Sequence, residues 1–307
     1  MIKQNSKIGI YKDDFKSLMR EYLQTGIMIG KNYVLNLKHG LFESGHGVKL
    51  TNRKGSSLEF MEHRDYLAGD DLRQLDWNVY ARTERLTVKL YREEINPTLD
   101  IIIDGSASMN LVNTQKLYTS LSLSSLIATA ASNANYLTKI WSTDDGVHEI
   151  RHGINHDAIM QWSEELKFTS TLNPNEAFNF HHGVFQHNGV RIFISDLLFT
   201  GEPKHLLRRI GLNSSAVIIL QILSEEDINP IVSNSTKIKD SETGEFTDIL
   251  IDEVAIKKYK QAFANHQQNW EHCCKECGAL LVTINAEEFQ TEFSLEQFIK
   301  HEILRFV

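Results

Sequence analysis

Short apolar runs alternate with longer amphipathic stretches over the last two-thirds of the chain. The apolar runs have the length of β-strands and contain many β-branched residues: Leu99–Ile103, Leu137–Ser142, Gly189–Ser195, Ala216–Leu223 and Leu280–Ile284. The stretches between them show helical spacing of apolar residues: Thr114–Asn135, Asp157–Lys167, Pro203–Ile210 and Glu253–Cys277. Near-continuous apolar strands that alternate with helices are typical of a parallel sheet with both faces covered. The pattern predicts an α/β, doubly wound domain with a mostly parallel sheet.

The part of the chain before Pro97 has a different pattern. The segment Asp14–Gln24 predicts a short amphipathic helix, and the residues after it mix glycine with short alternating segments such as Leu58–Glu62 and Leu86–Tyr91. A length of 307 residues also favours about two domains. We therefore predict a small N-terminal, strand-rich module with a short leading helix at residues 1–97. The α/β domain is expected at residues 98–307.

Composition and charge exclude several classes of protein. Lys and Arg number 32 against 40 Asp and Glu, and the net charge of −8 argues against broad attraction to nucleic acid or anionic membranes. The segment Met1–Lys7 has no apolar core of a secretory signal, and the longest apolar run is far shorter than the ~20 residues of a membrane span. The sequence predicts a cytoplasmic protein with no nucleic-acid partner and no membrane span.

The three cysteines lie together on a predicted helix, at positions 273, 274 and 277. A single Cys-x-x-Cys beside His272 suggests zinc, but a tetrahedral structural site usually draws on two such pairs. We interpret these residues as buried or idle thiols. Their confinement to one short stretch also favours a reducing compartment, because they cannot cross-link distant parts of the fold.

The candidate chemistry lies where the first strand of the α/β half ends. Asp104, Ser106 and Ser108 come after that strand at alternate positions, and a second apolar strand ends in Asp196 in the same way. Ligands of open α/β sheets bind at the carboxyl ends of strands, near the point where the strand order reverses. If the two strands are neighbours, both carboxylates face one small volume and repel each other unless a cation joins them. Oxygen ligands from Asp and Ser suit Mg²⁺, Mn²⁺ or Ca²⁺ and not zinc.

Two motifs resemble a known bacterial family: Arg64–Trp77, and after it in the chain Asp104–Ser108. Asp104–Ser108 is similar to the Asp-x-Ser-x-Ser element that builds the metal-ion-dependent adhesion site of von Willebrand factor A domains. Arg64–Trp77, followed by Ala81 and Arg82, resembles the signature of the family called domain of unknown function 58. The resemblance runs from about Gly40 to Ile284 and includes three later pieces: Ile194–Leu197, Asp240–Gly244 and Tyr259.

The resemblance implies a von Willebrand factor A-like fold and a set of five metal ligands: Asp104, Ser106, Ser108, Thr171 and Asp196. In this family pattern the two serines bind the ion directly, and the two aspartates hold it mainly through ordered waters. The threonine position departs from the pattern, because residues 169–172 read Thr-Ser-Thr-Leu where the family often shows Gly-Gly-Thr-Asp. Thr171 is the better candidate there, and Thr169 is the alternative.

The predicted function depends on the position that such a site leaves open. Mg²⁺ takes six oxygens, and a carboxylate from another protein can fill the vacant position. We therefore expect a non-enzymatic, divalent-metal-dependent module for protein–protein interaction. The resemblance implies that its partner is a MoxR-type AAA+ ATPase and that the pair acts in maturation or activation of client proteins. Two alternatives stay open: a metal-dependent hydrolase that uses Asp104 and Asp196, and a structural domain with an empty site.

Opposite charges alternate around Trp77 in the second motif: Arg64, Asp70, Asp71, Arg73, Asp76 and Arg82. Such alternation most often holds a small module in place through paired hydrogen bonds. We favour that structural role over direct contact with a partner.

Overall fold

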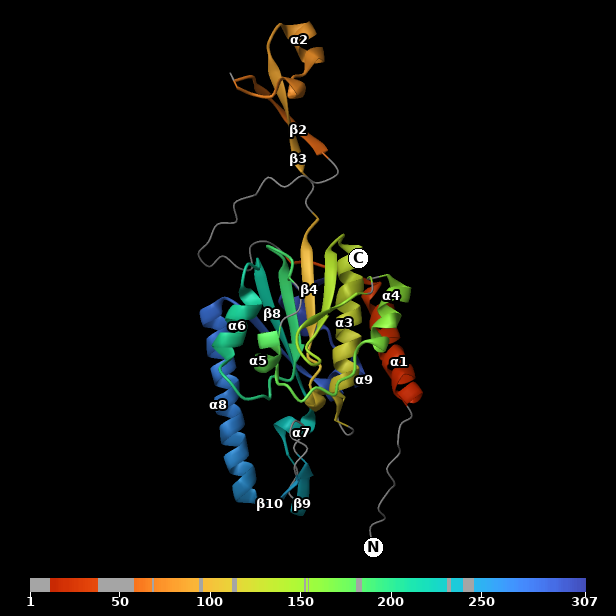
Figure 1. Ribbon diagram of the computed structural model, residues 1–307, viewed down its shortest axis with the longest axis vertical. Helices are drawn as coiled ribbons and strands as arrows, with labels where there is room; N and C mark the ends of the chain where they lie inside the picture. The colour runs from red at the N-terminus through yellow and green to blue at the C-terminus, as the bar shows by residue number, and fades with distance from the viewer. Residues whose placement is uncertain are drawn as a thin grey trace. The chain divides into compact units, whose positions relative to one another are not determined.

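The computed structural model describes residues 12–37, 58–67, 69–93, 96–111, 115–151, 153, 155–180, 184–230, 233–239 and 246–307. The chain forms two compact units. The larger unit contains Met1–Gly45 and Thr98–Val307, and the smaller unit contains His46–Pro97. Figure 1 shows the elements of both units, each of which is described by itself.

A six-stranded sheet forms the centre of the larger unit. In spatial order its strands are β11 (Leu280–Asn285), β8 (Ala216–Leu223), β7 (Val190–Ser195), β4 (Thr98–Ile103), β5 (Leu137–Ser142) and β6 (His148–Ile150). Neighbouring strands are parallel except for the edge pair β5–β6. Strands β7 and β8 are buried along their whole length, which explains why their sequences are almost continuously apolar. The sheet confirms the predicted α/β, doubly wound, mostly parallel fold.

Helices cover both faces of this sheet (Figure 1). Residues alternate along β4, so that Leu99, Ile101 and Ile103 enter one hydrophobic cluster and Ile102 enters the other. The first cluster includes residues of α1 (Lys12–Gly30), α3 (Lys116–Asn133), α4 (His156–Gln161), η3 (Trp162–Glu164), α9 (Ala286–Glu292) and α10 (Glu296–Lys300). The second includes residues of α5 (Pro174–Ala177), η4 (Phe178–Phe180), α6 (Pro203–Gly211) and α8 (Glu253–Cys277).

The leading helix is longer than predicted and belongs to the larger unit. It packs along α3, where Met19, Leu23 and Ile27 are fully buried. The backbones approach closely at Gly26, because an added Cβ would lie 2.0 Å from the carbonyl oxygen of Ser122. The prediction placed this helix in the N-terminal module, whereas in the structure it belongs to the larger unit. The apolar face of α1 is buried in the core of the α/β unit instead.

Two strand pairs lie outside the central sheet of the larger unit. Strand β1 (Tyr33–Leu35) pairs with β12 (Leu304–Phe306), which joins the segment after α1 to the C-terminal part of the chain. Strands β9 (Ser233–Lys239) and β10 (Phe246–Ile251) form an antiparallel pair. The segment Asp240–Gly244, one piece of the family resemblance, lies outside the described residues. Short helices follow the ends of β4 and β8: η2 (Ala107–Asn110) comes after β4, and α7 (Glu225–Ile228) comes after β8.

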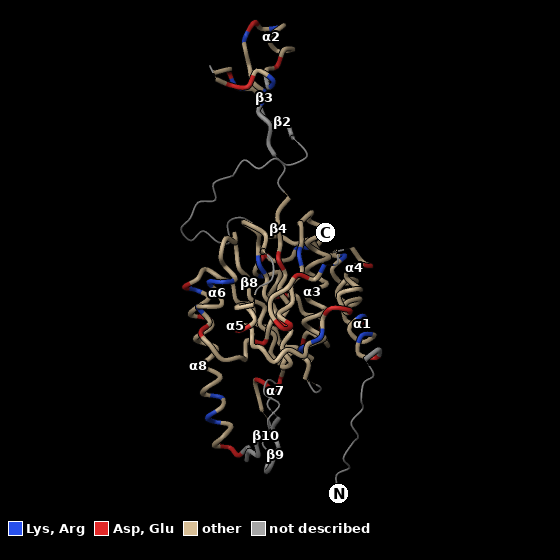
Figure 2. The backbone as a smooth tube through the Cα atoms, in the orientation of Figure 1, with Lys and Arg blue, Asp and Glu red and all other residues tan. Residues whose placement is uncertain are grey.

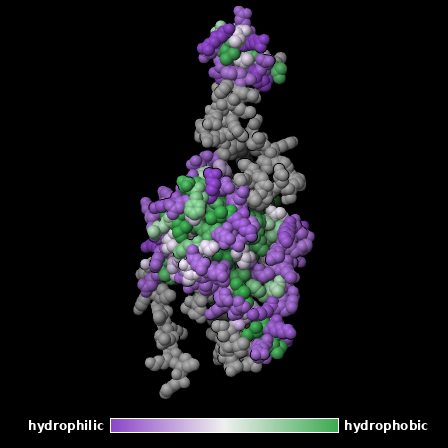
Figure 3. Space-filling view, turned by 180° about the vertical axis from the view of Figure 1, so that it is seen from behind, coloured by the Kyte–Doolittle hydropathy of each residue, from purple (hydrophilic) through white to green (hydrophobic). Residues whose placement is uncertain are grey.

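Charged and apolar residues both reach the surface of the larger unit. Helices α1 and α8 carry both basic and acidic residues, whereas the charged residues of α6 are all basic (Figure 2). An apolar area on the back face is bordered by hydrophilic residues (Figure 3). Met28 and Phe306, which line a shallow hollow, are among the exposed hydrophobic residues.

The smaller unit is built on the antiparallel pair β2 (Leu58–Asp65) and β3 (Thr87–Glu93). Between these strands lie η1 (Leu72–Gln74) and α2 (Trp77–Thr83). Acidic residues of the second motif hold the turns of this unit: Asp71 accepts from the amide of Arg73, and Asp70 pairs with Arg64 at 2.9 Å.

Asp76 is the central acid of the smaller unit. Its carboxylate caps α2 by accepting from the amides of Asn78 and Val79. The other oxygen lies 2.8 Å from His63 Nε2 and 3.3 Å from Lys89 Nζ. The hydrogen bond from His63 is the main reason why the pKa of Asp76 falls to about 2. Asp76 thus contacts β2 and β3 and caps α2.

Candidate ion site at the ends of strands β4 and β7

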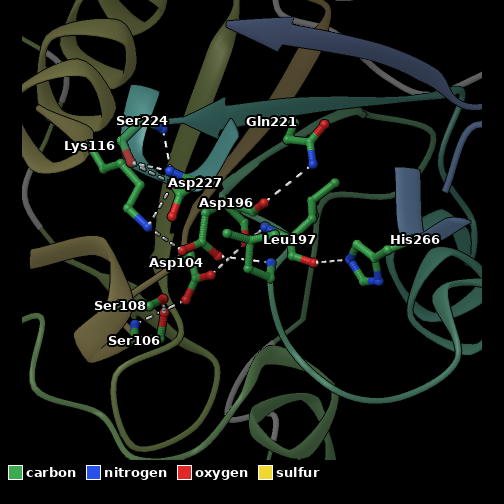
Figure 4. Close-up of polar contacts among 12 residues, drawn as sticks. Asp104, Ser106, Ser108, Lys116, Asp196, Leu197, Gln221, Ser224, Asp227 and His266 are labelled. Atoms are coloured by element: carbon green, nitrogen blue, oxygen red, sulfur yellow. Dashed lines mark hydrogen bonds and ion pairs between the residues drawn. The ribbon is translucent and has the colours of Figure 1, made fainter. Parts of the chain in front are cut away.

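The two predicted aspartates lie at the carboxyl ends of neighbouring strands. Strand β4 pairs with β7 up to Ile103 and Ile194, and the amide of Asp104 donates to the carbonyl of Ile194 at 2.9 Å. The strand order reverses at β4, because β5 lies on one side of it and β7 on the other. Figure 4 shows the carboxylates of Asp104 and Asp196 close to each other. Their relative exposures are 0% and 1%, so both are removed from solvent.

The carboxylate of Asp104 is held from three directions. Oδ1 accepts from the amide of Ser106 at 2.9 Å and from the hydroxyl of Thr143 at 3.3 Å. Oδ2 accepts from the hydroxyl of Ser195 at 2.6 Å. Burial, and secondly the charge of Asp196, raise the pKa of Asp104 to about 6 despite these hydrogen bonds. Two adjacent buried carboxylates repel each other, and a cation placed between them would relieve this repulsion.

This pKa predicts an unusual dependence of stability on pH in the metal-free protein. Folded Asp104 keeps its proton up to about pH 6, whereas the unfolded residue releases it near pH 3.8. Between these values the folded state binds more protons, so raising the pH favours unfolding. The shift of roughly two units corresponds to about 3 kcal/mol in the free energy of unfolding.

Denaturant unfolding in EDTA at several pH values between 4 and 7 measures this effect. The contribution of Asp104 is the difference between wild type and Asp104→Asn, since all other groups titrate in both proteins. We expect wild type to lose stability relative to the variant as the pH rises to about 6, with no further change above it. Parallel stability curves for the two proteins would contradict the assignment.

The hydroxyls of Ser106 and Ser108 are separated by 3.0 Å. Neighbouring ligands of an octahedral Mg²⁺, each about 2.1 Å from the ion, are also about 3.0 Å apart. Ser106 precedes η2, and its hydroxyl makes no hydrogen bond that caps this helix. Glycine is required between Asp104 and Ser106, because a Cβ at Gly105 would lie 2.5 Å from the carboxyl carbon of Asp144. The loop therefore presents two hydroxyls at a spacing that suits a hard cation.

The segment with the candidate threonines runs beside this loop. Ser170 accepts from the amide of Ala107 at 3.1 Å and donates its own amide to the carbonyl of Gly105 at 3.2 Å. Ser170 is buried, whereas Thr169 and Thr171 on either side of it are exposed. The structure thus brings both threonines next to the loop, and Thr171 stays the predicted fifth ligand.

The sequence reasoning missed Lys116. This residue begins α3, is 1% exposed, and places Nζ 2.8 Å from Asp196 Oδ2 and 3.4 Å from Asp227 Oδ2. Burial by itself would lower the pKa of Lys116, but the charges of Asp196 and Asp227 raise it above its usual value. A signal was present in the sequence, because Lys116 is the one charged residue of α3, a helix that is described over its full length. A lone lysine in an otherwise uncharged, buried helix usually has a partner.

The donors at this site fit a hard divalent cation. Two carboxylates and two serine hydroxyls converge from β4, β7 and the loop after β4 (Figure 4). Oxygen donors of this kind are preferred by Mg²⁺, Mn²⁺ and Ca²⁺. Within the part of the chain that the structure describes, no three His, Cys, Asp or Glu side chains form a metal cluster. Any ion at this site would therefore depend on the hydroxyl oxygens as well as on the acids.

The cysteines of α8 are free thiols, and Cys273 and Cys274 are buried as predicted. Burial raises the pKa of Cys274 to about 12, so it is protonated at neutral pH and unreactive. Across the described ranges, the helices are too short or too polar to cross a bilayer.

Similar proteins are found among known sequences and among solved structures. An uncharacterized protein of Mycobacterium tuberculosis is 23% identical over 267 residues, which cover 82% of each chain. A protein of Mycobacterium bovis matches to the same extent. Among solved structures, a conserved hypothetical protein BatB from Bacteroides thetaiotaomicron is 11% identical, with a TM-score of 0.38 over 67% of this chain and 98% of that one.

A second solved structure, an aerotolerance-related membrane protein from Bacteroides fragilis, has a TM-score of 0.41 and 11% identity over 68% of this chain and 98% of that one. The profile of the family described as "Protein of unknown function DUF58" matches residues 62–269, which is more than half of the chain. The match covers the two motifs that suggested this family, Arg64–Trp77 and Asp104–Ser108. The chain therefore belongs to the DUF58 family.

Proposed function

We propose that this chain is a metal-dependent module for protein–protein interaction. The observation that carries the proposal is the convergence of two buried carboxylates and two hydroxyls at one end of the sheet. Asp104 and Asp196 would supply the negative charge, and Ser106 and Ser108 would contact the ion directly. When bound, Mg²⁺ or a similar ion would offer an open coordination position to a carboxylate of the partner.

A binding role suits these residues better than catalysis. Asp104 has a pKa near neutrality, as a general base requires, but it is fully buried and its two oxygens accept hydrogen bonds from the chain itself. Such a group cannot reach a substrate without breaking these contacts. We therefore propose a non-enzymatic function and treat a metal-dependent hydrolase as the alternative.

We further propose a MoxR-type AAA+ ATPase as the partner, with maturation or activation of client proteins as the shared task and the cytoplasm as the location. The support for this step is the resemblance of the two motifs to the family, together with the chemistry of the site. A site that takes a carboxylate requires an exposed Asp or Glu on the partner. ATP hydrolysis would belong to the ATPase.

Binding of the full chain to a purified MoxR-type ATPase from the same genome tests this proposal. We expect binding in Mg²⁺ and a loss of at least about tenfold in affinity in EDTA, equivalent to about 1.4 kcal/mol. The double variant Ser106→Ala and Ser108→Ala is expected to show the same loss in Mg²⁺. Ser132→Ala, at an exposed position of α3, is the matched control. Equal affinity in Mg²⁺ and EDTA would overturn the proposal.

A further inference from the structure

We propose that Lys116 is an internal competitor of the ion at Asp196, and that its release from Asp196 links ion binding to α7 and α8. This inference rests on the proposed ion site. It adds that the chain has two states: in one the ammonium group of Lys116 contacts Asp196, and in the other the ion is bound.

The first argument is the position of the ammonium group. Nζ of Lys116 lies on Asp196 Oδ2 at 2.8 Å, while Oδ1 of the same carboxylate accepts from the amide of Leu198 at 3.0 Å. Both oxygens of Asp196 are thus occupied in this state. An ion, or a water bound to it, that uses Asp196 Oδ2 must share it with the ammonium or replace it.

The second argument is electrostatic. Lys116 and Asp196 are each 1% exposed, so solvent and salt screen the charges around them weakly. A divalent ion beside Asp196 would therefore be repelled strongly by an ammonium group on the same carboxylate. We infer that the two cations do not share Asp196 in their present arrangement.

Asp227 offers the ammonium group a second partner. Its Oδ2 lies 3.4 Å from Lys116 Nζ, so a small movement of the flexible lysine side chain replaces Asp196 by Asp227 without exposure to solvent. The same carboxylate oxygen accepts from the amide and the hydroxyl of Ser224, which begins α7. The backbone carbonyl of Asp227 accepts from the hydroxyl of Tyr259 on α8 at 2.7 Å.

These contacts connect the ion site to elements at its rim. Asp227 contacts Lys116 and Ser224 at the start of α7 (Figure 4). Its backbone carbonyl also accepts from Tyr259 of α8. A closer contact between Lys116 and Asp227 on ion loading would change the hydrogen bonds at Ser224 and Tyr259. Ion binding would thereby alter the arrangement of α7 relative to α8.

Titration calorimetry of the full chain with Mn²⁺ tests the competition. Lys116→Met keeps the length of the side chain and removes the charge. We expect the variant to bind Mn²⁺ at least about tenfold more tightly than wild type. Lys139→Met, which removes a partly exposed lysine paired with Glu149, is the control and is expected to bind like wild type.

The outcomes separate this inference from the proposed function. If wild type binds Mn²⁺ and Lys116→Met binds it equally or more weakly, the competition is refuted and the ion site stands. If neither protein binds Mn²⁺, the ion site itself is refuted, and the inference falls with it.

A second measurement covers the case in which Lys116→Met folds poorly. Asp227→Asn removes the alternative partner and leaves Lys116 on Asp196, so we expect Mn²⁺ binding about tenfold weaker than in wild type. Glu226→Gln removes one exposed charge from the same helix and is the matched control. Equal affinities of the Asn and Gln variants would overturn the role of Asp227 and the release of Lys116.

Discussion

Asp104→Ala is expected to lower the affinity for Mn²⁺ at least about 100-fold, equivalent to roughly 2.7 kcal/mol. Asp104 is fully buried and lies next to Asp196 and the two serines, so its charge acts on an ion with little screening. Its carboxylate also fixes the loop by accepting from the amide of Ser106. The loss combines a missing charge with a less ordered pair of hydroxyls. Calorimetry or the electron paramagnetic resonance signal of free Mn²⁺ measures it.

Asp157→Ala provides a control for this loss. Its side chain is 96% exposed on α4, and its removal changes the net charge of the protein by the same amount. We expect unchanged Mn²⁺ affinity in this variant. If Asp104→Ala kept the wild-type affinity for Mn²⁺, Asp104 would not contribute to the ion site, which would contradict the account.

Asp100→Ala is expected to have the largest effect on folding, a loss of about 3–5 kcal/mol in the free energy of unfolding. Asp100 is fully buried on β4, where it accepts from Trp141 Nε1 and from the amide of Gln186, each at 2.9 Å. Arg191 on β7 is also buried, and its Nε lies 3.7 Å from the carboxylate. Removal of the acid leaves this guanidinium without its charged partner in the core.

Urea unfolding at neutral pH measures the loss. The double variant Asp100→Leu with Arg191→Leu is expected to recover part of the stability, since it leaves no single charge buried. Asp157→Ala should change stability by less than about 0.5 kcal/mol, as is usual at exposed positions. A loss below about 1 kcal/mol in Asp100→Ala would contradict the importance of this pair.

The sequence was most informative where the local pattern alone determines an element. The predicted strand Ala216–Leu223 and the predicted helix Glu253–Cys277 coincide with β8 and α8. A strand buried on both faces is apolar throughout, and α8 has clear ends because Asp252 caps its start and Gly278 its end. The closeness of Asp104 and Asp196 was predictable for a related reason, since both come directly after apolar strands that lie side by side.

The features that were missed depend on contacts between distant segments. An amphipathic pattern shows that one face of the leading helix is buried, but it does not identify α3 as the helix that covers it. Gly26 has no distinctive signal in the sequence, although it allows the close contact with Ser122. The role of Lys116 depends on Asp196, 80 residues further along the chain, and spacing in the sequence cannot show such a pair.

The most direct test of the ion site is the anomalous difference density of a crystal of the full chain grown in Mn²⁺. We predict a peak in contact with the hydroxyls of Ser106 and Ser108, on the side that faces Asp104 and Asp196. Mn²⁺-saturated crystals that show no peak between these four residues would contradict the account.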